Sequence, residues 1–468
     1  MEKKGFQKFV VPVLLIALLF IALPTVAVSA SEELSADEKV VLSHLPDQQI
    51  GKKYPTGETI NIGFLCALSG PDAGWGLPGL TGNTIWVDAV NKTGGLLVGG
   101  KRYPLKMHTF DDEANASKAL QGARQLVMEH DVKFISAIGG DAANATAPFL
   151  TKHKVIYASL VPTDCDPRRP YVVGGGDITP QCNMFNTLMA KMVLSEKKLG
   201  RPIKFALATQ DCIMSRQVGA WEVGAAKAMG FDIVYEKFFA VDTTDFAPVV
   251  TAMMATNPDV ISLCEAWPEY QTMMWEQLYL QGFKGIVVQN YADWETNLTK
   301  IPAEYAAARQ AIDSFPLMND PWWGETSWQK SFTNVWNERY GPGAPEDVQR
   351  KMTGIDWDHM IWLIPWCIGA QEAGQDTPGK WPSNDAILAA LRKLPSFPTI
   401  LGPGHMSGKE MFGIDNMIEE PVPMCMFNLK AKDKRIIAHL NFEPWYNSIK
   451  DIVIKEVRAR GQMWDQRK

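Results

Sequence analysis

The sequence predicts an α/β protein with two doubly wound, parallel-sheet lobes joined by a hinge. The chain has 468 residues, which is enough for two separate hydrophobic cores. From about residue 59 to residue 290, short β-branched runs alternate with amphipathic helical stretches, a pattern typical of parallel sheets covered by helices. A Pro- and Gly-rich segment from residue 160 to 182 interrupts this alternation once, so it divides the pattern into two halves.

The first thirty residues have the layout of a secretory signal peptide. A Lys-rich start precedes an apolar run from Phe9 to Val28, and small residues follow up to Ala30. We expect cleavage after Ala30. The alternative is a retained membrane anchor, because the apolar run is long enough to cross a bilayer. Pro24 interrupts the run and favours cleavage, so we expect an exported protein.

Composition narrows the class of function. Hydrophobic residues make up 46% and charged residues 21%, and the formal net charge is −6. Lys and Arg form no dense run, which argues against nucleic-acid binding. The seven Cys and seven His show no zinc-ligand spacing, so no metal and no cofactor are predicted. Cys165 and Cys182 flank a turn-rich stretch and are the most plausible disulfide pair for an exported protein.

The first lobe is predicted from four strands and three helices. The helix over Ser117–His130 places Leu120, Ala123 and Val127 on one face, as expected for packing on a sheet. The predicted strands lie at 59–68, 104–110, 132–138 and 155–159, and the predicted helices run over 80–91, over 117–130 and after Gly140.

The second lobe repeats this rhythm from residue 204. Its predicted strands lie at 204–208, 232–238, 259–263 and 285–289, and its predicted helices at 215–229, 246–255 and 269–281. A Trp-rich final third contains helical stretches at 328–340, 355–374 and 383–394, followed by strand-like stretches at 421–429 and 435–440. The Trp residues there recur at helical spacing, so we expect them in the core of the first lobe.

These elements predict the division of the chain. Residues 31–56 form an N-terminal arm, residues 57–175 and 316–420 form lobe 1, residues 176–315 and 421–455 form lobe 2, and residues 456–468 form a C-terminal tail. In parallel sheets, ligands bind in the crevice at the carboxyl ends of the strands. The loops expected there lie at 69–76, 139–146 and 159–163 in lobe 1, and at 209–216, 264–269 and 289–294 in lobe 2.

Those loops carry hydroxyls, backbone amides and aromatic rings. They contain no GxSxG elbow, no phosphate-binding GxxxxGK[ST] loop and no metal spacing, so the sequence favours a binding cleft over an enzyme. Asp111 and Asp112 stand between a predicted strand and a predicted helix, where carboxylates typically cap the helix. We therefore expect a structural role for this pair.

Four motifs carry a resemblance to a known family. The segment "INIGFLCALSGPDAGWG", the segments "VDAVNKTGGL" and "DDEANASKALQGARQLV", and the Gly139–Gly140 pair resemble the type I periplasmic binding proteins of the leucine/isoleucine/valine-binding family. The likeness covers about residues 58–300. It implies a periplasmic protein that captures an amino-acid-like molecule, an amide or an aromatic acid and delivers it to the membrane subunits of an ABC importer. A ligand-sensing receptor for a membrane partner is the alternative, and an enzyme using the same cleft is less favoured.

The resemblance also implies ligand-binding residues. Trp75 falls where the family places an aromatic residue over the ligand, whereas Tyr291 falls at or beside the family's ammonium-binding acid, so a branched-chain amino acid is not the expected ligand. Asp141, at a helix start, would repel an anion or attract a cation. The predicted ligand-binding set is Trp75, Gly140, Asp141, Ala142, Ala143, Val161, Thr163, Ser215 (or Met214), Trp267, Tyr291 and Trp294, with Asp211, Arg216, Glu265 and Asp293 as further polar partners. Three hinge segments are implied near 172–186, 310–320 and 415–425.

Overall fold

A computed structural model of the chain describes residues 33–45, 47–70, 72–175, 179–195, 197–314, 326–350 and 352–467. The predicted signal peptide lies outside these residues. Within them, no helix combines the length and the apolar character that crossing a bilayer requires.

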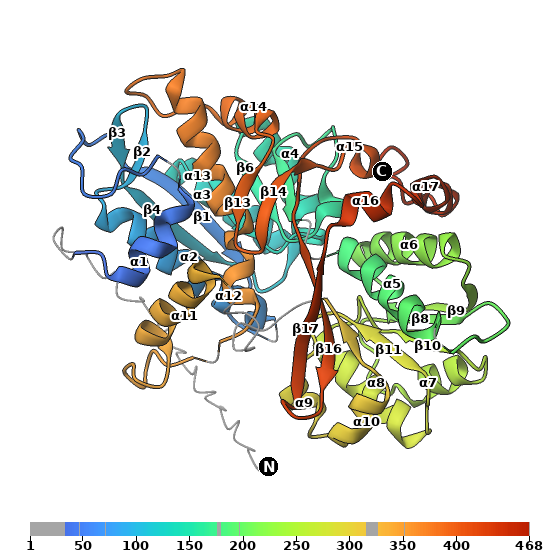
Figure 1. The fold of residues 1–468 in the computed structure, drawn as a ribbon. Helices are drawn as coiled ribbons and strands as arrows, with labels where there is room; N and C mark the ends of the chain where they lie inside the picture. The colour runs from blue at the N-terminus through green and yellow to red at the C-terminus, as the bar shows by residue number, and fades with distance from the viewer. Residues whose placement is uncertain are drawn as a thin grey trace, which may run out of the picture.

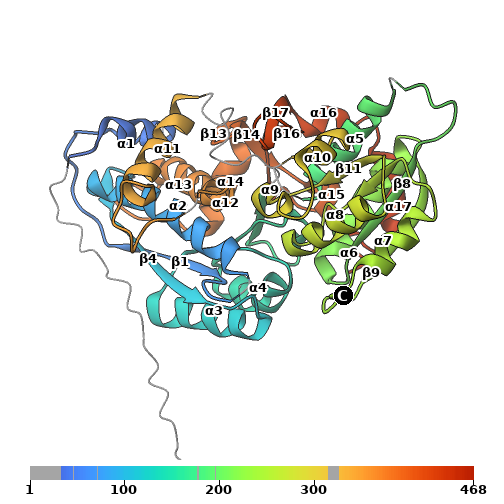
Figure 2. The ribbon, with the colours of Figure 1, turned by 90° about the horizontal axis from the view of Figure 1, so that it is seen from below.

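Two lobes, each built around one sheet, make up the molecule (Figures 1 and 2). The lobe 1 sheet has eight strands in the order β13-β14-β15-β7-β6-β5-β1-β4. Its strands are β1 (Ile60–Cys66), β4 (Leu105–Asp111), β5 (Phe134–Ala137), β6 (Ile156–Ser159), β7 (Val172–Gly175), β13 (Phe397–Thr399), β14 (Gly402–Ser407) and β15 (Met417–Glu419). The helices of lobe 1 are α2 (Ala73–Lys92), α3 (Ala116–His130), α4 (Asp141–His153), α11 (Ser327–Tyr340), α12 (Ile355–Asp358), α13 (Met360–Gln375), α14 (Asn384–Lys393) and α15 (Lys409–Phe412), and a small hairpin joins β2 (Leu96–Val98) to β3 (Lys101–Tyr103).

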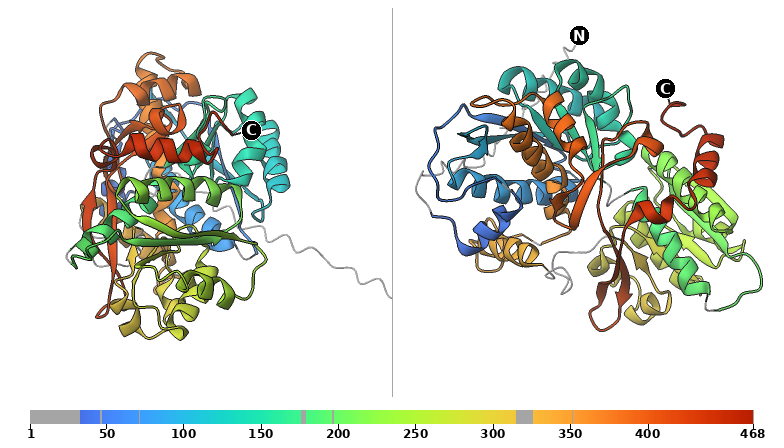
Figure 3. Two further views of the ribbon diagram at one scale, coloured as in Figure 1. Left: turned by 90° about the vertical axis from the view of Figure 1, so that its right-hand side faces the viewer. Right: turned by 45° about the horizontal axis from the view of Figure 1, so that its top comes forward.

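The lobe 2 sheet has seven strands in the order β17-β16-β12-β11-β10-β8-β9. Its strands are β8 (Lys204–Gln210), β9 (Asp232–Phe239), β10 (Val260–Ser262), β11 (Ile286–Gln289), β12 (Ile312–Asp313), β16 (Val422–Asn428) and β17 (Asp433–Leu440). Its helices are α5 (Gln181–Ser195), α6 (Ile213–Ala228), α7 (Ala247–Met254), α8 (Pro268–Leu280), α9 (Trp294–Asn297), α10 (Ala303–Ala308), α16 (Phe442–Tyr446) and α17 (Lys450–Ala459). Figure 3 shows α17 beside α6 on one face of this sheet.

The strand order puts a topological switch point in each lobe. In lobe 1 the chain runs from β1 to β4 on one side and then returns to β5 on the other side of β1. In lobe 2 it runs from β8 to β9 and then to β10 on the opposite side of β8. Loops diverge at such points and leave a crevice at the carboxyl ends of the strands. The predicted α/β class with two doubly wound lobes is confirmed.

Each sheet also contains antiparallel strand pairs, which the prediction of parallel sheets did not include. Strands β13, β14 and β15 pair antiparallel at the edge of the first sheet, and β12, β16 and β17 do so at the edge of the second. Strands β16 and β17 follow each other through a short connection, which allows only antiparallel pairing. The short gap between the strand-like stretches at 421–429 and 435–440 was a sign of this pairing in the sequence, and the prediction of parallel sheets did not use it.

Helix α2 begins at Ala73, earlier than the predicted start at Leu80, so Trp75 lies on a helix and not in a loop. Two glycines within α2 allow close packing. A Cβ on Gly79 would approach the His359 ring to 2.1 Å, and a Cβ on Gly82 would approach the Asp356 carbonyl oxygen to 1.5 Å. Helix α2 can therefore lie against α12 only with glycine at these positions.

The predicted N-terminal arm is part of lobe 1. Helix α1 (Ala36–Val41) packs on α11, and Val41 and Leu42 are fully buried. The Glu38 carboxylate pairs with Lys92 at 2.9 Å and with Arg339 at 3.1 Å. These contacts join the described part of residues 33–56 to the same core as α2, which the polar character of the segment did not suggest.

The chain passes between the lobes where the hinge segments are predicted. It leaves lobe 1 between β7 and α5, returns between β12 and α11, and leaves again between β15 and β16. Residues 176–178 of the first crossing and 315–325 of the second lie outside the described residues. Bending at these segments stays a prediction.

The predicted C-terminal tail contacts both lobes. Helix α17 continues to Ala459, and Arg460 pairs with Glu236 of lobe 2. Beyond it, the Trp464 carbonyl accepts a hydrogen bond from Arg168 of lobe 1 at 2.9 Å, and the Arg467 guanidinium donates to the Thr163 carbonyl. The final residues therefore connect lobe 2 back to lobe 1.

Two predictions about side chains have clear outcomes. Cys165 and Cys182 are both buried, but no disulfide joins them in the structure, so the predicted pairing is wrong. The Trp residues of the final third are core residues as predicted: Trp328, Trp336, Trp357 and Trp362 are at most 3% exposed.

Candidate functional site

A cavity of about 360 Å³ lies between the lobes, at the two switch points. Its lobe 1 wall is formed by residues at or after the carboxyl ends of β1, β4, β5 and β6. Its lobe 2 wall is formed by residues at or after the carboxyl ends of β8, β9, β10 and β11. The described lining residues are Cys66, Ala67, Asp72, Trp75, Asp112, Ala114, Ile138, Gly139, Gly140, Asp141, Ala142, Leu160 and Val161 from lobe 1, with Thr179, Cys212, Met214, Val241, Cys264, Glu265, Ala266, Trp267, Pro268 and Tyr291. Such a volume suits a small molecule.

Helix α4 begins at the cavity because two glycines precede it. Gly139 has φ +104°, and a Cβ there would lie 2.0 Å from the Ser159 Oγ and 2.6 Å from the Asp164 Oδ2. The Asp164 carboxyl accepts hydrogen bonds from the Gly140 N–H and from the Ser159 hydroxyl, both at 2.8 Å. Burial raises the pKa of Asp164 to about 6. A carboxyl group of the protein therefore already occupies the donor nearest the start of α4.

The acidic pair after β4 does not cap the following helix as predicted. Asn115 is the N-cap of α3, where its side chain accepts from the Ser117 and Lys118 amides. The Asp111 carboxylate instead accepts from the Leu68 amide at 2.9 Å and from the Ser69 hydroxyl at 2.5 Å. Asp111 thus orders the loop that leads into α2.

Asp112 is the one member of the pair that lines the cavity. Its side chain is fully buried; Oδ1 accepts from the Ala114 amide at 2.9 Å, whereas Oδ2 has no hydrogen-bond partner. Burial raises the pKa of Asp112, and the nearby charges of Asp111 and Asp72 raise it further. A buried carboxyl oxygen without a donor is costly to the folded protein.

Aromatic rings from the two lobes meet at the cavity. The Trp75 and Tyr291 rings form an edge-to-face pair with centroids 5.0 Å apart and an interplanar angle of 77°. Tyr291 has φ +59°, a conformation that non-glycine residues seldom adopt. Trp267 stacks on Tyr270 with centroids 5.3 Å apart. The lobes therefore touch through rings that also line the cavity.

The lobe 2 wall is an interconnected hydrogen-bond network. Glu265 Oε1 accepts from the Asn183 amide at 2.9 Å, and the Glu265 backbone carbonyl accepts from Gln210 at 2.6 Å. Gln210 also donates to Ser215 at 3.0 Å, and the Asn290 amide donates to Asn183. Burial raises the pKa of Glu265 to about 8, so this side chain is largely protonated at neutral pH.

Three thiols line the cavity, from Cys66, Cys212 and Cys264. Burial raises the pKa of each of them, so all three stay protonated at neutral pH. A protonated thiol is a weak nucleophile and a poor metal ligand. Among the residues that the structure describes, no group of His, Cys, Asp and Glu is arranged to hold a metal ion.

Carboxyl groups are the source of charge among the described lining residues of the cavity, and Glu265 among them is largely protonated at neutral pH. Four carboxyl groups line it, from Asp72, Asp112, Asp141 and Glu265, and the described lining residues include no Lys, Arg or His. Burial also raises the pKa of Asp72. The arrangement can accept hydrogen bonds and can neutralise a positive charge, and it offers no cationic side chain to an anion.

Seven of the eleven predicted residues line this cavity, namely Trp75, Gly140, Asp141, Ala142, Val161, Trp267 and Tyr291. The other four do not. Ala143 is a buried residue of α4, and Thr163 is buried in a short turn, where its hydroxyl has no hydrogen-bond partner. Trp294 packs on Trp275 and Phe427 in the lobe 2 core.

The remaining predicted polar residues also divide into those that line the cavity and those that do not. Glu265 lines the cavity, but Asp211 and Arg216 pair with each other at 2.6 Å, and Asp293 caps α9 through the Thr296 amide. On α6, Met214 lines the cavity while Ser215 is buried, because one residue along a helix turns the side chain by about 100°. The prediction that the loops at strand ends bind the ligand located the region, but it did not resolve which side chains face the cavity.

Sequence reasoning missed several lining residues. Asp112 was assigned to a helix cap, and Cys66, Ile138, Val241 and Cys264 were not singled out. All of them stand at or just beyond the carboxyl end of a strand. Applying that rule to every strand, and not only to loops with polar or aromatic residues, would have found them.

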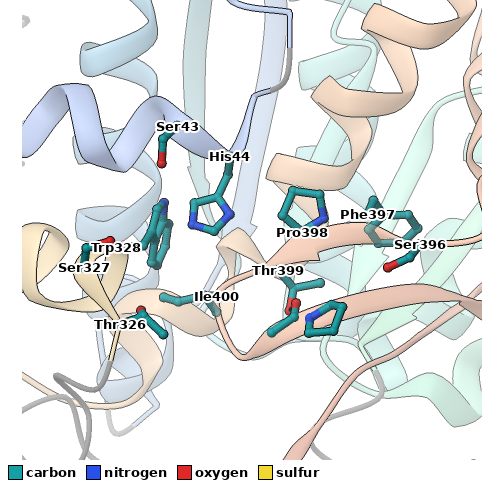
Figure 4. Close-up of a pocket in the computed structure, with 12 residues that line it drawn as sticks. Ser43, His44, Thr326, Ser327, Trp328, Ser396, Phe397, Pro398, Thr399 and Ile400 are labelled. Carbon is teal, nitrogen blue, oxygen red and sulfur yellow. The ribbon is translucent and has the colours of Figure 1, made fainter.

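A second cavity, of about 480 Å³, lies within lobe 1 at the β13 edge of the sheet (Figure 4). It is lined by Ser43, His44, Thr326, Ser327, Trp328, Ser396, Phe397, Pro398, Thr399, Ile400, Gly402 and Pro403. The His44 and Trp328 rings meet edge to face there, with centroids 4.8 Å apart. Its described lining residues include no carboxyl group, no basic group besides His44 and no residue of lobe 2, so the interlobe cavity is the stronger candidate.

Comparison with known proteins agrees with this architecture. A family model described as periplasmic binding protein matches residues 59–427. Among solved structures, an ABC transporter substrate-binding protein of Aeropyrum pernix aligns with a TM-score of 0.66 at 15% identity, covering 85% of this chain and 99% of the other.

Two further solved structures carry ligand names. A solute-binding protein of an ABC transporter from R. palustris, in complex with 4-hydroxybenzoate, aligns with a TM-score of 0.62 at 18% identity and covers 84% of this chain and 100% of its own. A leucine-binding protein of Thermotoga maritima aligns with a TM-score of 0.60 at 15% identity, covering 82% of this chain and 100% of the other. At these identities the likeness shows a shared fold.

Proposed function

The chain belongs to the periplasmic binding protein family, and we propose that its interlobe cavity captures a small molecule for delivery to the membrane subunits of an ABC importer. One observation carries this proposal: a cavity lined by residues of both lobes lies where the two switch points face each other. A ligand held there contacts both sheets at once. The closed form then differs from the open form on its outer surface, which a transporter can recognise.

The proposed motion is a rotation of one lobe against the other. The crossings between β7 and α5 and between β15 and β16 give the hinge its short connecting segments. Trp75 of lobe 1 and Tyr291 of lobe 2 meet across the cavity, so closure brings these rings over the ligand. Hinge bending around a bound molecule is a common closing motion of two-lobed proteins.

The compartment follows from the N-terminus. The signal-peptide pattern of residues 1–30 supports export to the periplasm with cleavage after Ala30. In that compartment the protein would meet its ligand before the membrane subunits do. N-terminal sequencing of the exported protein tests the cleavage position.

Two observations support binding over catalysis. The cavity thiols are held protonated by burial, and Glu265, the most perturbed carboxyl in the cavity, hydrogen-bonds to an amide and not to a nucleophile. A hydrolase or transferase would need a nucleophile beside a base. The solved relatives bear the names of 4-hydroxybenzoate and leucine, so aromatic acids and aliphatic amino acids belong in any ligand screen.

A thermal-shift screen tests the proposal. The panel comprises amino acids, amides, urea, aromatic acids and amines, because a ligand that binds only the folded protein raises its melting temperature by mass action. We expect Trp75→Ala and Tyr291→Ala to abolish the shift caused by any hit. Tyr279→Ala removes an exposed ring from α8 outside the cavity and serves as the matched control. A shift that persists in both cavity variants would remove this cavity from consideration.

A further inference from the structure

We infer that the ligand is a small protonated amine: an organic cation that carries at least one N–H donor on an apolar or aromatic body. This inference rests on the proposed function, since it concerns the same interlobe cavity. It goes beyond it by selecting a charge sign and a hydrogen-bonding group. Three independent features of the described residues point the same way.

The first feature is the sign of the charge. Four carboxyl groups approach the cavity from both lobes, and no basic side chain is among its described lining residues. Two of these groups are close enough to influence each other, since the charge of Asp72 adds to the effect of burial on the pKa of Asp112. A cation would relieve the repulsion among these groups, whereas an anion would add to it.

The second feature is the unpartnered oxygen of Asp112. This side chain is completely buried and lines the cavity, and its Oδ2 has no donor although Oδ1 has one. A ligand N–H would supply the missing donor in a charge-assisted bond. A quaternary ammonium ion has no N–H, so the geometry favours a primary or secondary amine.

The third feature is the aromatic surround. Trp75, Trp267 and Tyr291 line the same cavity, together with Ile138, Leu160 and Met214. A cation near such rings is attracted to their faces, and the body that carries it is removed from water. An ammonium group on an aromatic or aliphatic body uses both properties of the wall.

The start of helix α4 does not argue for an anion. A helix N-terminus alone favours negative charge, but here Asp141 and Asp164 place two carboxyl groups of the protein at that end. Asp164 already accepts from the Gly140 N–H. A ligand carboxylate arriving at the same position would meet both acids.

Isothermal titration of the mature protein tests the inference with a matched set of probes. Phenethylamine is the amine, 3-phenylpropionate the anion, 2-phenylethanol the uncharged analogue, and trimethyl(phenethyl)ammonium the cation without an N–H. We expect phenethylamine to bind on the order of 10-fold or more tightly than each of the other three, the range that a buried charged hydrogen bond can supply.

Variants locate the cation. Asp112→Asn keeps the shape of the side chain and should weaken phenethylamine by on the order of 10-fold or more while changing 2-phenylethanol little. Asp211→Asn removes a carboxylate that pairs with Arg216 outside the cavity and should leave both affinities unchanged. The melting temperature of ligand-free Asp112→Asn should equal or exceed that of the parent, since an unpartnered buried charge is lost. This measurement separates loss of binding from loss of folding.

The outcomes separate this inference from the proposed function. Equal or tighter binding of 3-phenylpropionate, or unchanged phenethylamine affinity in Asp112→Asn, overturns the inference. If phenethylamine fails while 4-hydroxybenzoate or leucine binds and Trp75→Ala abolishes that binding, the amine class is wrong and the transport role stands. If no compound of the set or of the wider screen binds, both proposals fall.

Discussion

Both walls of the cavity lie at the carboxyl ends of parallel strands, yet they differ in whether their buried carboxyl groups have hydrogen-bond donors. On the lobe 1 wall, Asp112 keeps a buried carboxyl oxygen without any donor. On the lobe 2 wall, Glu265 is hydrogen-bonded through Asn183 and Gln210 to a network of amides. The lobe 1 wall therefore carries a buried carboxyl oxygen with unmet hydrogen-bonding capacity, whereas the carboxyl group of the lobe 2 wall already has a donor within the protein.

This difference indicates an order of events. A group that lacks a partner in the free protein gains most from a ligand, so the first contact should form on lobe 1. A carboxyl group that already has a donor, as Glu265 has in Asn183, gains less from a ligand and stays fixed by its network. We therefore expect lobe 1 variants to alter affinity with little loss of stability, and lobe 2 network variants to lower stability first.

The largest expected effect is on lobe 2. Asn183→Ala removes the donor to Glu265 and the acceptor of the Asn290 amide, and leaves both partners buried. We expect the free energy of unfolding to fall by about 2 kcal/mol, the usual cost of stranding buried polar groups. Urea denaturation measures this, with Asp112→Asn as the lobe 1 counterpart that should lose nothing. Equal losses in the two variants would contradict the contrast between the walls.

A second effect concerns pH. Burial raises the pKa of Glu265 to about 8, and Glu222, which adds to that shift, has its own pKa raised to about 7. The folded protein then binds more protons than the unfolded chain between the ordinary Glu pKa and these values, so ligand-free stability should fall as pH rises from about 5 to 8.

Glu265→Gln should remove its share of this slope, a change on the order of 1 kcal/mol over the interval. Denaturation midpoints at several pH values provide the measurement. A midpoint that rises with pH in the parent protein, or an identical slope in the variant, would show that Glu265 is charged in the folded state. Glu222 remains in the variant and keeps part of the slope.

The smallest expected effect concerns the C-terminal residues, which lie outside the cavity and connect the two lobes. The Arg467 guanidinium donates to the Thr163 carbonyl and to the Cys165 carbonyl at 3.4 Å. Arg467→Ala should lower the free energy of unfolding by about 1 kcal/mol. It should also increase the radius of gyration of the ligand-free protein in solution scattering, because one tie between the lobes is lost. Lys455→Ala, on exposed α17 surface, is the control, and an unchanged scattering profile would show that this tie does not restrain the lobes.

Much of the fold could be predicted because the relevant signals are local. The residue patterns at 117–130 and 204–208 favour a helix and a strand whichever segment packs against them, and both elements are present. The start of α2 could not be predicted this way. Gly79 and Gly82 weaken a helix in isolation, and only the approach of α12 makes them favourable.

The residues of the candidate site also divide into those that local signals could predict and those that only tertiary packing decides. Trp75, Trp267 and Tyr291 lie in the segments that follow β1, β10 and β11, the region in which parallel sheets bind ligands, and all three line the cavity. Thr163 and Trp294 lie in such segments too, yet they face the interior, because neighbouring segments decide the direction of each side chain. Asp112 followed a familiar capping pattern, but the side chain that accepts from the first amides of α3 is that of Asn115.

By itself, the sequence determined the alternation of strands and helices, the division into two lobes and the strand ends at which a ligand could lie, because those properties depend on neighbours within a few residues. The tertiary structure alone decided which carboxyl oxygen lacks a donor and which rings meet across the lobes. Hydrogen-bond satisfaction depends on groups that the chain brings together from distant segments, as when Asn183 reaches Glu265, and no local pattern encodes that meeting.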